Sequence, residues 1–95
     1  MASIIDDEII ERVKSETDIV EVIGRYTKLQ KKGRSYMGLC PFHGEKTPSF
    51  SVQAEKGYYH CFGCGVGGDV IKFLMEKEGL GFIEAVEKLA EELNI

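Results

Sequence analysis

The chain carries two pairs of Cys and His side chains whose spacing could hold a metal ion. Cys40 and His43 form the first pair, and Cys61 and Cys64 form the second, with two residues between the members of each pair. Such spacing lets a tight turn direct both donor atoms at one ion. Three thiolates and one imidazole suit Zn²⁺, which takes four sulfur or nitrogen ligands in a tetrahedron. The sequence therefore predicts a zinc ribbon in which these four residues hold one Zn²⁺.

Such an ion would be structural, because four protein ligands leave no open position for a substrate. Apparent binding free energies of structural zinc sites, ~10–16 kcal/mol, exceed the whole stability of most small domains, ~5–15 kcal/mol. An iron–sulfur cluster usually takes four Cys, and this chain has three. A thioredoxin-like redox pair at Cys61 and Cys64 would begin a helix after a buried parallel strand, which the flanking sequence does not favour. His60 neighbours Cys61 on a predicted strand, so it points to the opposite face and is left out of the ligand set.

The elements that must position these residues are predicted to be β-strands in the middle of the chain and helices at both ends. The runs TKLQKK, RSYMGL, SFSV and GYYHC are rich in aromatic and β-branched residues and are separated by Gly and Pro turn signals. We therefore expect a small α+β fold over residues 1–95: a zinc ribbon (26–68) with an antiparallel sheet, flanked by helical segments (1–25 and 69–95).

Helix boundaries are marked by capping residues. Asp18 is a predicted N-cap of a short helix that stops at Gly24. Asp69 is a predicted N-cap of a helix that Gly79 ends, because Gly readily takes the left-handed conformation. A last helix is expected over residues 82–93, where apolar residues keep helical spacing.

Charge is distributed unevenly along the 95 residues. The formal net charge is −4. Residues 1–21 carry −5, residues 22–60 carry +5 and residues 61–95 carry −4, counted from the sequence. The acidic total argues against nucleic acid, but the positive middle makes a local anionic partner plausible, although a solvated face explains such a stretch equally well.

Strand alternation predicts which side chains face outward. If Cys61 points to the metal, then Tyr58, His60 and Phe62 lie on the other face of their strand. Arg34 and Tyr36 share one side of the strand predicted from RSYMGL. Rings beside cations suit single-stranded nucleic acid, because bases stack on the rings and cations hold the phosphates. The predicted binding residues are Arg34, Tyr36, Lys46, Lys56, Tyr58, His60 and Phe62. The alternative is that some of these aromatic side chains are buried under the terminal helices.

Compartment and membrane signals are also readable from the sequence. No apolar run approaches the ~18–20 residues of a membrane span, and the opening residues are acidic where a signal peptide would be basic. The three Cys cannot form a complete disulfide framework within one chain. We therefore expect a cytoplasmic protein without a membrane partner.

The runs GRSYMGLCPFHGEKTPSFSV and YYHCFGCGVGGDVIKFLMEKEG resemble the N-terminal zinc-binding domain of bacterial DNA primases. The upstream run IIERVKSETDIVEVIGRYTKLQKKG resembles the helices and first strand that precede it there, so the resemblance covers nearly the whole chain. All four ligand positions and the Gly-rich turn are present. The sequence departs from the family at Gln53-Ala54, where Ser-Pro or Asn-Pro is expected, and we expect this pair to lie in a turn.

The resemblance implies a domain that binds single-stranded template DNA and assists the start of RNA primer synthesis in DNA replication. It further implies that nucleotidyl transfer belongs to a separate polymerase domain, on the same or a neighbouring chain, and that the replicative helicase is contacted through regions absent here. The chain is then expected to be a non-catalytic domain excised from a longer primase. Two alternatives stay open: a zinc-ribbon docking module for a protein partner, and a small redox protein that uses Cys61 and Cys64.

Overall fold

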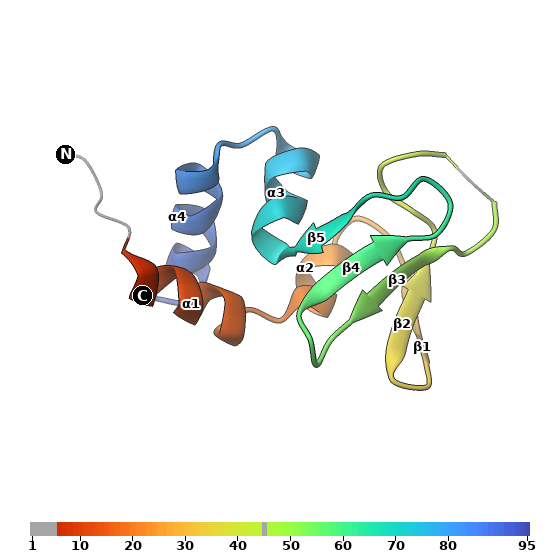
Figure 1. The fold of residues 1–95 in the computed structure, drawn as a ribbon, viewed down its shortest axis with the longest axis horizontal. Helices are drawn as coiled ribbons and strands as arrows, with labels where there is room; N and C mark the ends of the chain where they lie inside the picture. The colour runs from red at the N-terminus through yellow and green to blue at the C-terminus, as the bar shows by residue number, and fades with distance from the viewer. Residues whose placement is uncertain (1–5, 45) are drawn as a thin grey trace.

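The computed structural model describes residues 6–44 and 46–95 and shows a sheet at one end of the molecule and most of the helices at the other (Figure 1). The helices among these residues are α1 (Asp7–Glu16), α2 (Ile19–Gly24), α3 (Val70–Glu78) and α4 (Phe82–Glu92). The strands are β1 (Leu29–Lys32), β2 (Ser35–Gly38), β3 (Phe50–Gln53), β4 (Tyr58–Cys61) and β5 (Gly67–Asp69). The expected α+β fold, with helices on both sides of an antiparallel sheet in the sequence, is confirmed.

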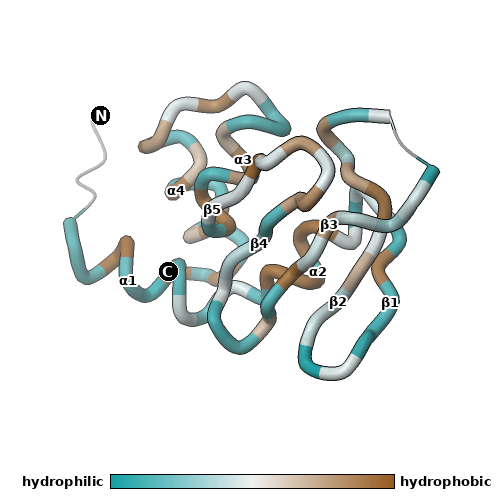
Figure 2. The backbone as a smooth tube through the Cα atoms, turned by 45° about the vertical axis from the view of Figure 1, so that its right-hand side comes forward, coloured by the Kyte–Doolittle hydropathy of each residue, from teal (hydrophilic) through white to brown (hydrophobic). Residues whose placement is uncertain are grey.

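The five strands form one antiparallel sheet in the order β1-β2-β3-β4-β5, so every strand pairs with its neighbour in the sequence. Its two faces differ in burial. Phe50, Val52, Tyr59 and Cys61 lie on one face and are buried. We call this the core face and the opposite one the open face. The turns at the ends of the β1–β2 and β3–β4 hairpins are hydrophilic (Figure 2).

An aromatic cluster joins the sheet to α3 on the core face. The ring of Phe73 makes edge contacts with Tyr26, Phe42 and Tyr59 at centroid distances of 5.4, 5.3 and 5.5 Å. Edge-to-face pairs at this spacing stabilise a core beyond their buried area, because the ring edge is positive and the ring face negative. Phe42 lies between Cys40 and His43, so the cluster ties the candidate ligands to the hydrophobic core.

The predicted helix caps are present. Asp18 accepts hydrogen bonds from the backbone N–H of Val20 and Glu21, and Asp69 accepts one from Lys72. Gly79 ends α3 in the left-handed conformation, with φ of 70°. The first helix begins at Asp7, and the part of the expected helical segment 1–25 that precedes residue 6 lies outside the described residues.

Two sequence-based expectations differ from the structure. Residues 67–69, where the sequence predicted no strand, form β5 and pair with β4. A Cβ atom on Gly67 would lie 2.9 Å from the carbonyl oxygen of Tyr59, so only glycine lets the two strands approach this closely. Gln53 lies in β3 rather than in a turn, where its side chain joins the open face.

Ion pairs join the helices to one another and to the end of β5. Arg25, at the end of α2, donates two hydrogen bonds to Glu92 of α4 at 3.0 and 3.1 Å and one to Glu21. Lys14 of α1 lies 3.8 Å from Asp69. Within the described part of the chain, no helix is long and apolar enough to cross a membrane.

We expect Asp69→Ala to lower the free energy of unfolding by about 1 kcal/mol, because α3 loses the acceptor at its N-terminus. Asp69→Asn is the matched control, since asparagine caps helices about as well as aspartate. Urea unfolding of the three chains provides the comparison. Equal destabilisation by both substitutions would mean that the ion pair with Lys14, and not the cap, is the stabilising contact.

Candidate metal centre and open sheet face

Four donor atoms from two segments of the chain converge at one end of the sheet. Cys40 and His43 lie in the loop after β2, Cys61 is the last residue of β4, and Cys64 lies in the turn before β5. One donor atom from each of these residues lies within 4.8 Å of all the others. The structure therefore brings together all four residues that the sequence predicted as ligands.

The donor set fits zinc by distance as well as by chemistry. The Sγ atoms of Cys40 and Cys64 are 3.9 Å apart. A tetrahedral ion with Zn–S bonds of ~2.3 Å places two sulfurs about 3.8 Å apart. A disulfide needs an S–S distance of ~2.05 Å, so these thiols are not a bonded pair, and their spacing suits two ligands of one ion.

Local hydrogen bonds hold each pair of candidate ligands in a turn. The backbone N–H of Gly65 donates to the carbonyl of Cys61 at 2.8 Å, and Gly65 has a φ of 83° that favours glycine. In the first pair, the backbone N–H of Phe42 points at the Cys40 sulfur at 3.4 Å. N–H groups aimed at sulfur stabilise a thiolate, which is the form that binds a metal.

The buried thiols ionise differently because their surroundings differ. Burial raises the pKa of the Cys40 thiol to about 11, against the opposing hydrogen bond from the Phe42 backbone. Burial also opposes ionisation of Cys61, but hydrogen bonds from the Cys64 backbone and from the hydroxyl of Ser49 outweigh it and lower the pKa to about 7. Since a thiol must lose its proton to bind a metal, ligation by this cluster would release protons.

Helix α3 contacts the loop that carries Cys40 and His43. The ammonium group of Lys77 donates a hydrogen bond of 2.8 Å to the carbonyl of Pro41 and lies 5.9 Å from the centre of the Phe42 ring. A cation close to a ring face is attracted by its negative charge distribution. The loop that carries Cys40 and His43 is thus fixed to α3 by polar and aromatic contacts.

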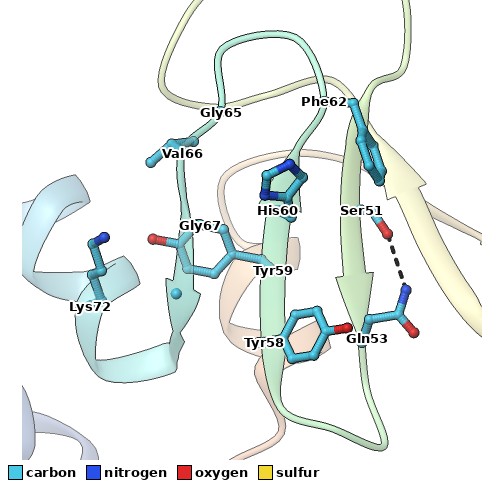
Figure 3. A pocket seen from close by; sticks show the side chains of 11 residues that line it. Ser51, Gln53, Tyr58, Tyr59, His60, Phe62, Gly65, Val66, Gly67 and Lys72 are labelled. Carbon is cyan, nitrogen blue, oxygen red and sulfur yellow. Dashed lines mark hydrogen bonds between the residues drawn. The ribbon is translucent and has the colours of Figure 1, made fainter.

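The open face of β4 presents three aromatic side chains around a groove of about 700 Å³ (Figure 3). Tyr58 is 41% exposed and Phe62 is 73% exposed, and the rings of His60 and Phe62 meet edge to face at 4.8 Å. We call this the aromatic groove. Its lining residues are Ser51, Gln53, Tyr58, Tyr59, His60, Phe62, Gly65, Val66, Gly67, Gly68 and Lys72.

Polar side chains that the sequence analysis missed also line the aromatic groove. The amide nitrogen of Gln53 donates to the hydroxyls of Ser35 at 2.8 Å and Ser51 at 3.3 Å, which holds the Gln53 side chain across two strands. Lys72 of α3 borders the opposite side of the groove (Figure 3). Period-two alternation in SFSVQ could have placed Ser51 and Gln53 on one face, but the expected turn at Gln53 hid this signal.

The structure does not gather all the predicted DNA-contacting residues on one surface. Tyr36 pairs with Val52, which pairs with Tyr59, and directly paired side chains share a face, so Tyr36 lies on the core face. Arg34 lies in the β1–β2 turn. Lys56 lies in the β3–β4 turn and lines a separate groove beside α1, and Lys46 lies in the loop after His43. Tyr58, His60 and Phe62 are the members that share the aromatic groove.

The basic residues near the sheet differ in their surroundings from four of the basic residues in and beside the helices. Arg12, Lys14, Arg25 and Lys72 each lie within ion-pairing distance of a carboxylate. No described carboxylate lies at that distance from the basic residues of the sheet and its loops, which are Lys28, Lys31, Lys32, Arg34, Lys46 and Lys56. The sheet region therefore keeps positive charge that an anionic partner can neutralise.

Residues 5–95 match the CHC2 zinc finger family. The chain is 60% identical over 87 residues to the DNA primase of Listeria monocytogenes, a match that covers 92% of this chain and 14% of that protein. It is 55% identical over 91 residues to the DNA primase of Geobacillus stearothermophilus, covering 96% of this chain and 15% of that protein. The chain thus spans about one seventh of the length of these relatives.

The fold is also similar to a solved structure. The crystal structure of the Aquifex aeolicus primase, with its zinc-binding and RNA polymerase domains, superposes with a TM-score of 0.81 at 44% sequence identity. The match covers 97% of this chain and 22% of that one. The similarity bears out the zinc-ribbon fold, and together with the Cys and His cluster the family match points to zinc binding.

The two histidines of the chain provide a matched test of the metal centre. We expect His43→Ala to lose tightly bound zinc and His60→Ala to keep it, because His43 belongs to the donor cluster and His60 points to the open face. Metal content of the purified variants after dialysis is the measurement. Loss of zinc from His60→Ala would show that the donor set is different.

Proposed function

Since this chain belongs to the CHC2 zinc finger family of DNA primases, we propose that it binds single-stranded template DNA and assists the start of RNA primer synthesis. The observation that carries the proposal is the open face of β4, where Tyr58, His60 and Phe62 surround one groove. Aromatic platforms on a sheet bind single strands, because each base has a flat face that stacks on a ring. The groove is wide enough for a nucleotide, since ligand pockets commonly measure ~300–1,000 Å³.

Electrostatics favour an anionic ligand at the sheet, although the chain as a whole is acidic. The cations of the sheet and its loops lack carboxylate partners among the described residues, so bound phosphates would not have to displace internal ion pairs. The net charge of −4 opposes the approach of a polyanion. We therefore propose weak and salt-sensitive binding by this chain alone, with a dissociation constant of ~10⁻⁴–10⁻⁶ M.

We also propose that one Zn²⁺ is held by Cys40, His43, Cys61 and Cys64 and that its role is structural. The donor distances and the mixture of thiols and imidazole support this assignment. Phe62 directly follows Cys61 in the sequence, and His60 directly precedes it. Ligation of Cys61 would therefore hold the end of β4 in place and, with it, two of the rings that line the aromatic groove.

Catalysis and further partners are proposed to lie outside this chain, in a cytoplasmic primase. A polymerase domain, on the same or a neighbouring chain, would carry out nucleotidyl transfer, and the replicative helicase would contact other regions. Attachment to a polymerase domain would raise the effective concentration of the open face near the template without any new contact. Weak binding by the chain alone is compatible with function under this arrangement.

We expect Cys64→Ser to remove the tightly bound zinc and to lower the melting temperature. Cys64 is exposed, so the substitution leaves the hydrophobic core intact, and any large loss of stability must come from the metal. Thermal melting with and without a chelator is the measurement. The chelator should lower the melting temperature of the parent chain and leave that of the variant unchanged. A variant that melts like the zinc-loaded parent would contradict the assignment.

Two further substitutions distinguish the contribution of ring stacking to DNA binding from that of charge. We expect Tyr58→Ala to weaken binding of a single-stranded oligonucleotide by ~1–3 kcal/mol with little change in salt dependence, because a stacking ring is lost. Lys46→Ala should weaken all sequences about equally and reduce the slope of log K against log[salt], because one phosphate contact is lost.

The matched controls for this comparison are Tyr58→Phe, which keeps the ring, and Lys88→Ala, which removes the same charge from α4. Titrations of the five chains at two salt concentrations provide the comparison. The proposal would be wrong if Tyr58→Ala bound DNA like the parent, or if Lys88→Ala weakened binding as much as Lys46→Ala.

A further inference from the structure

A second groove lies on the open face, at the free edge formed by β1. It has a volume of about 300 Å³. We call it the β1-edge groove, and the lining residues that matter here are Lys28, Gln30, Lys32, Met37, Leu39 and Pro48. None of them was among the residues predicted to contact DNA.

The strand register places both grooves on the same face of the sheet. Gln30 pairs with Met37, Met37 with Ser51, and Ser51 with His60. Directly paired side chains share a face, so this row runs from the β1-edge groove to the aromatic groove. Three strand spacings separate its ends, which is about 14 Å. One extended ligand can therefore reach both grooves without crossing an element of the fold.

The β1-edge groove combines an apolar floor with two cations. Met37, Leu39 and Pro48 supply the floor, and Leu39 is 42% exposed although it is a large apolar residue. Lys28 and Lys32 lie on its rim, exposed and without a described carboxylate at ion-pairing distance. An apolar surface can contact the flat face of a base, while ammonium groups attract the phosphates on either side of it.

We propose that the β1-edge groove is a second nucleotide subsite, which binds a further part of the same DNA strand that occupies the aromatic groove. The inference rests on the proposed function and extends it, because the strand then crosses the sheet from β4 to β1. A strand that occupies both subsites brings more of its phosphates close to lysine side chains than a strand in the aromatic groove alone. The salt dependence of binding must then increase with the length of the oligonucleotide.

The test compares a trinucleotide with a dodecanucleotide, each single-stranded, on the parent chain and on the double variant Lys28→Ala/Lys32→Ala. The trinucleotide should bind both chains alike, because the rings of the aromatic groove hold it. For the dodecanucleotide, the slope of log K against log[salt] should fall by about 1.4 in the double variant, since each neutralised phosphate of a single strand contributes about 0.7. The affinity at ~100 mM salt should fall on the order of tenfold.

Lys31→Ala and Lys32→Ala form the matched control pair. Both lysines lie on β1 and carry the same charge, but Lys31 pairs with Tyr36 on the core face, whereas Lys32 lines the groove. Lys32→Ala should therefore weaken dodecanucleotide binding more than Lys31→Ala does. Leu39→Ser should reduce the affinity without changing the slope, because it removes apolar contact and no charge.

The inference is overturned if the double variant keeps the parent's slope with the dodecanucleotide, or if Lys31→Ala and Lys32→Ala act equally. The groove and the unpaired edge of β1 would then belong to a protein partner that adds a strand to the sheet. The two proposals can fail separately. A parent chain that binds neither oligonucleotide contradicts the proposed function itself, whereas a parent that binds both with one slope contradicts the second subsite alone.

Discussion

The convergence of four donor atoms from two segments of the chain is the constraint on which the rest of this structure depends. The loop between β2 and β3 and the turn between β4 and β5 are rich in Gly and Pro and bury few apolar side chains. The donor cluster connects them, with the sulfurs of Cys40 and Cys64 3.9 Å apart, and so does the hydrogen bond of 2.9 Å from the backbone N–H of Phe62 to the carbonyl of Ser49. Aromatic contacts of Phe42 and the hydrogen bond from Lys77 then join this region to α3. This connection helps to position two rings of the aromatic groove, because His60 and Phe62 flank Cys61 in the sequence.

Paired and unpaired cations lie in different parts of the fold. Several cations of the helices pair with carboxylates, and Arg25, which belongs to the positive middle of the sequence, is neutralised by Glu21 and Glu92. The cations of the sheet and its loops have no described carboxylate at ion-pairing distance. Such a layout gives local attraction of a polyanion at the sheet and overall repulsion by the chain as a whole. This chain spans about one seventh of the length of the similar primases.

Local signals in the sequence predicted the local features correctly, whereas long-range pairing could not be predicted. Asp18, Asp69 and Gly79 cap their helices as expected, because capping depends on neighbouring backbone groups alone. Spacing within CPFH and CFGC likewise located the donor cluster. The strand register depends on the whole sheet, and it places Tyr36 on the core face, away from Tyr58. The strand at residues 67–69 was missed because paired glycines usually mark a turn, and here they allow close contact with β4.

The most direct test of the central claim, that the open face of the sheet binds single-stranded DNA, is an NMR titration of the zinc-loaded chain with a short oligonucleotide. Backbone amide shifts report the binding surface residue by residue. The account predicts that the largest shifts occur at Tyr58, His60, Phe62 and Gly67, around the aromatic groove. Shifts confined to α1 and α4 would contradict it, because those helices carry the acidic ends of the chain.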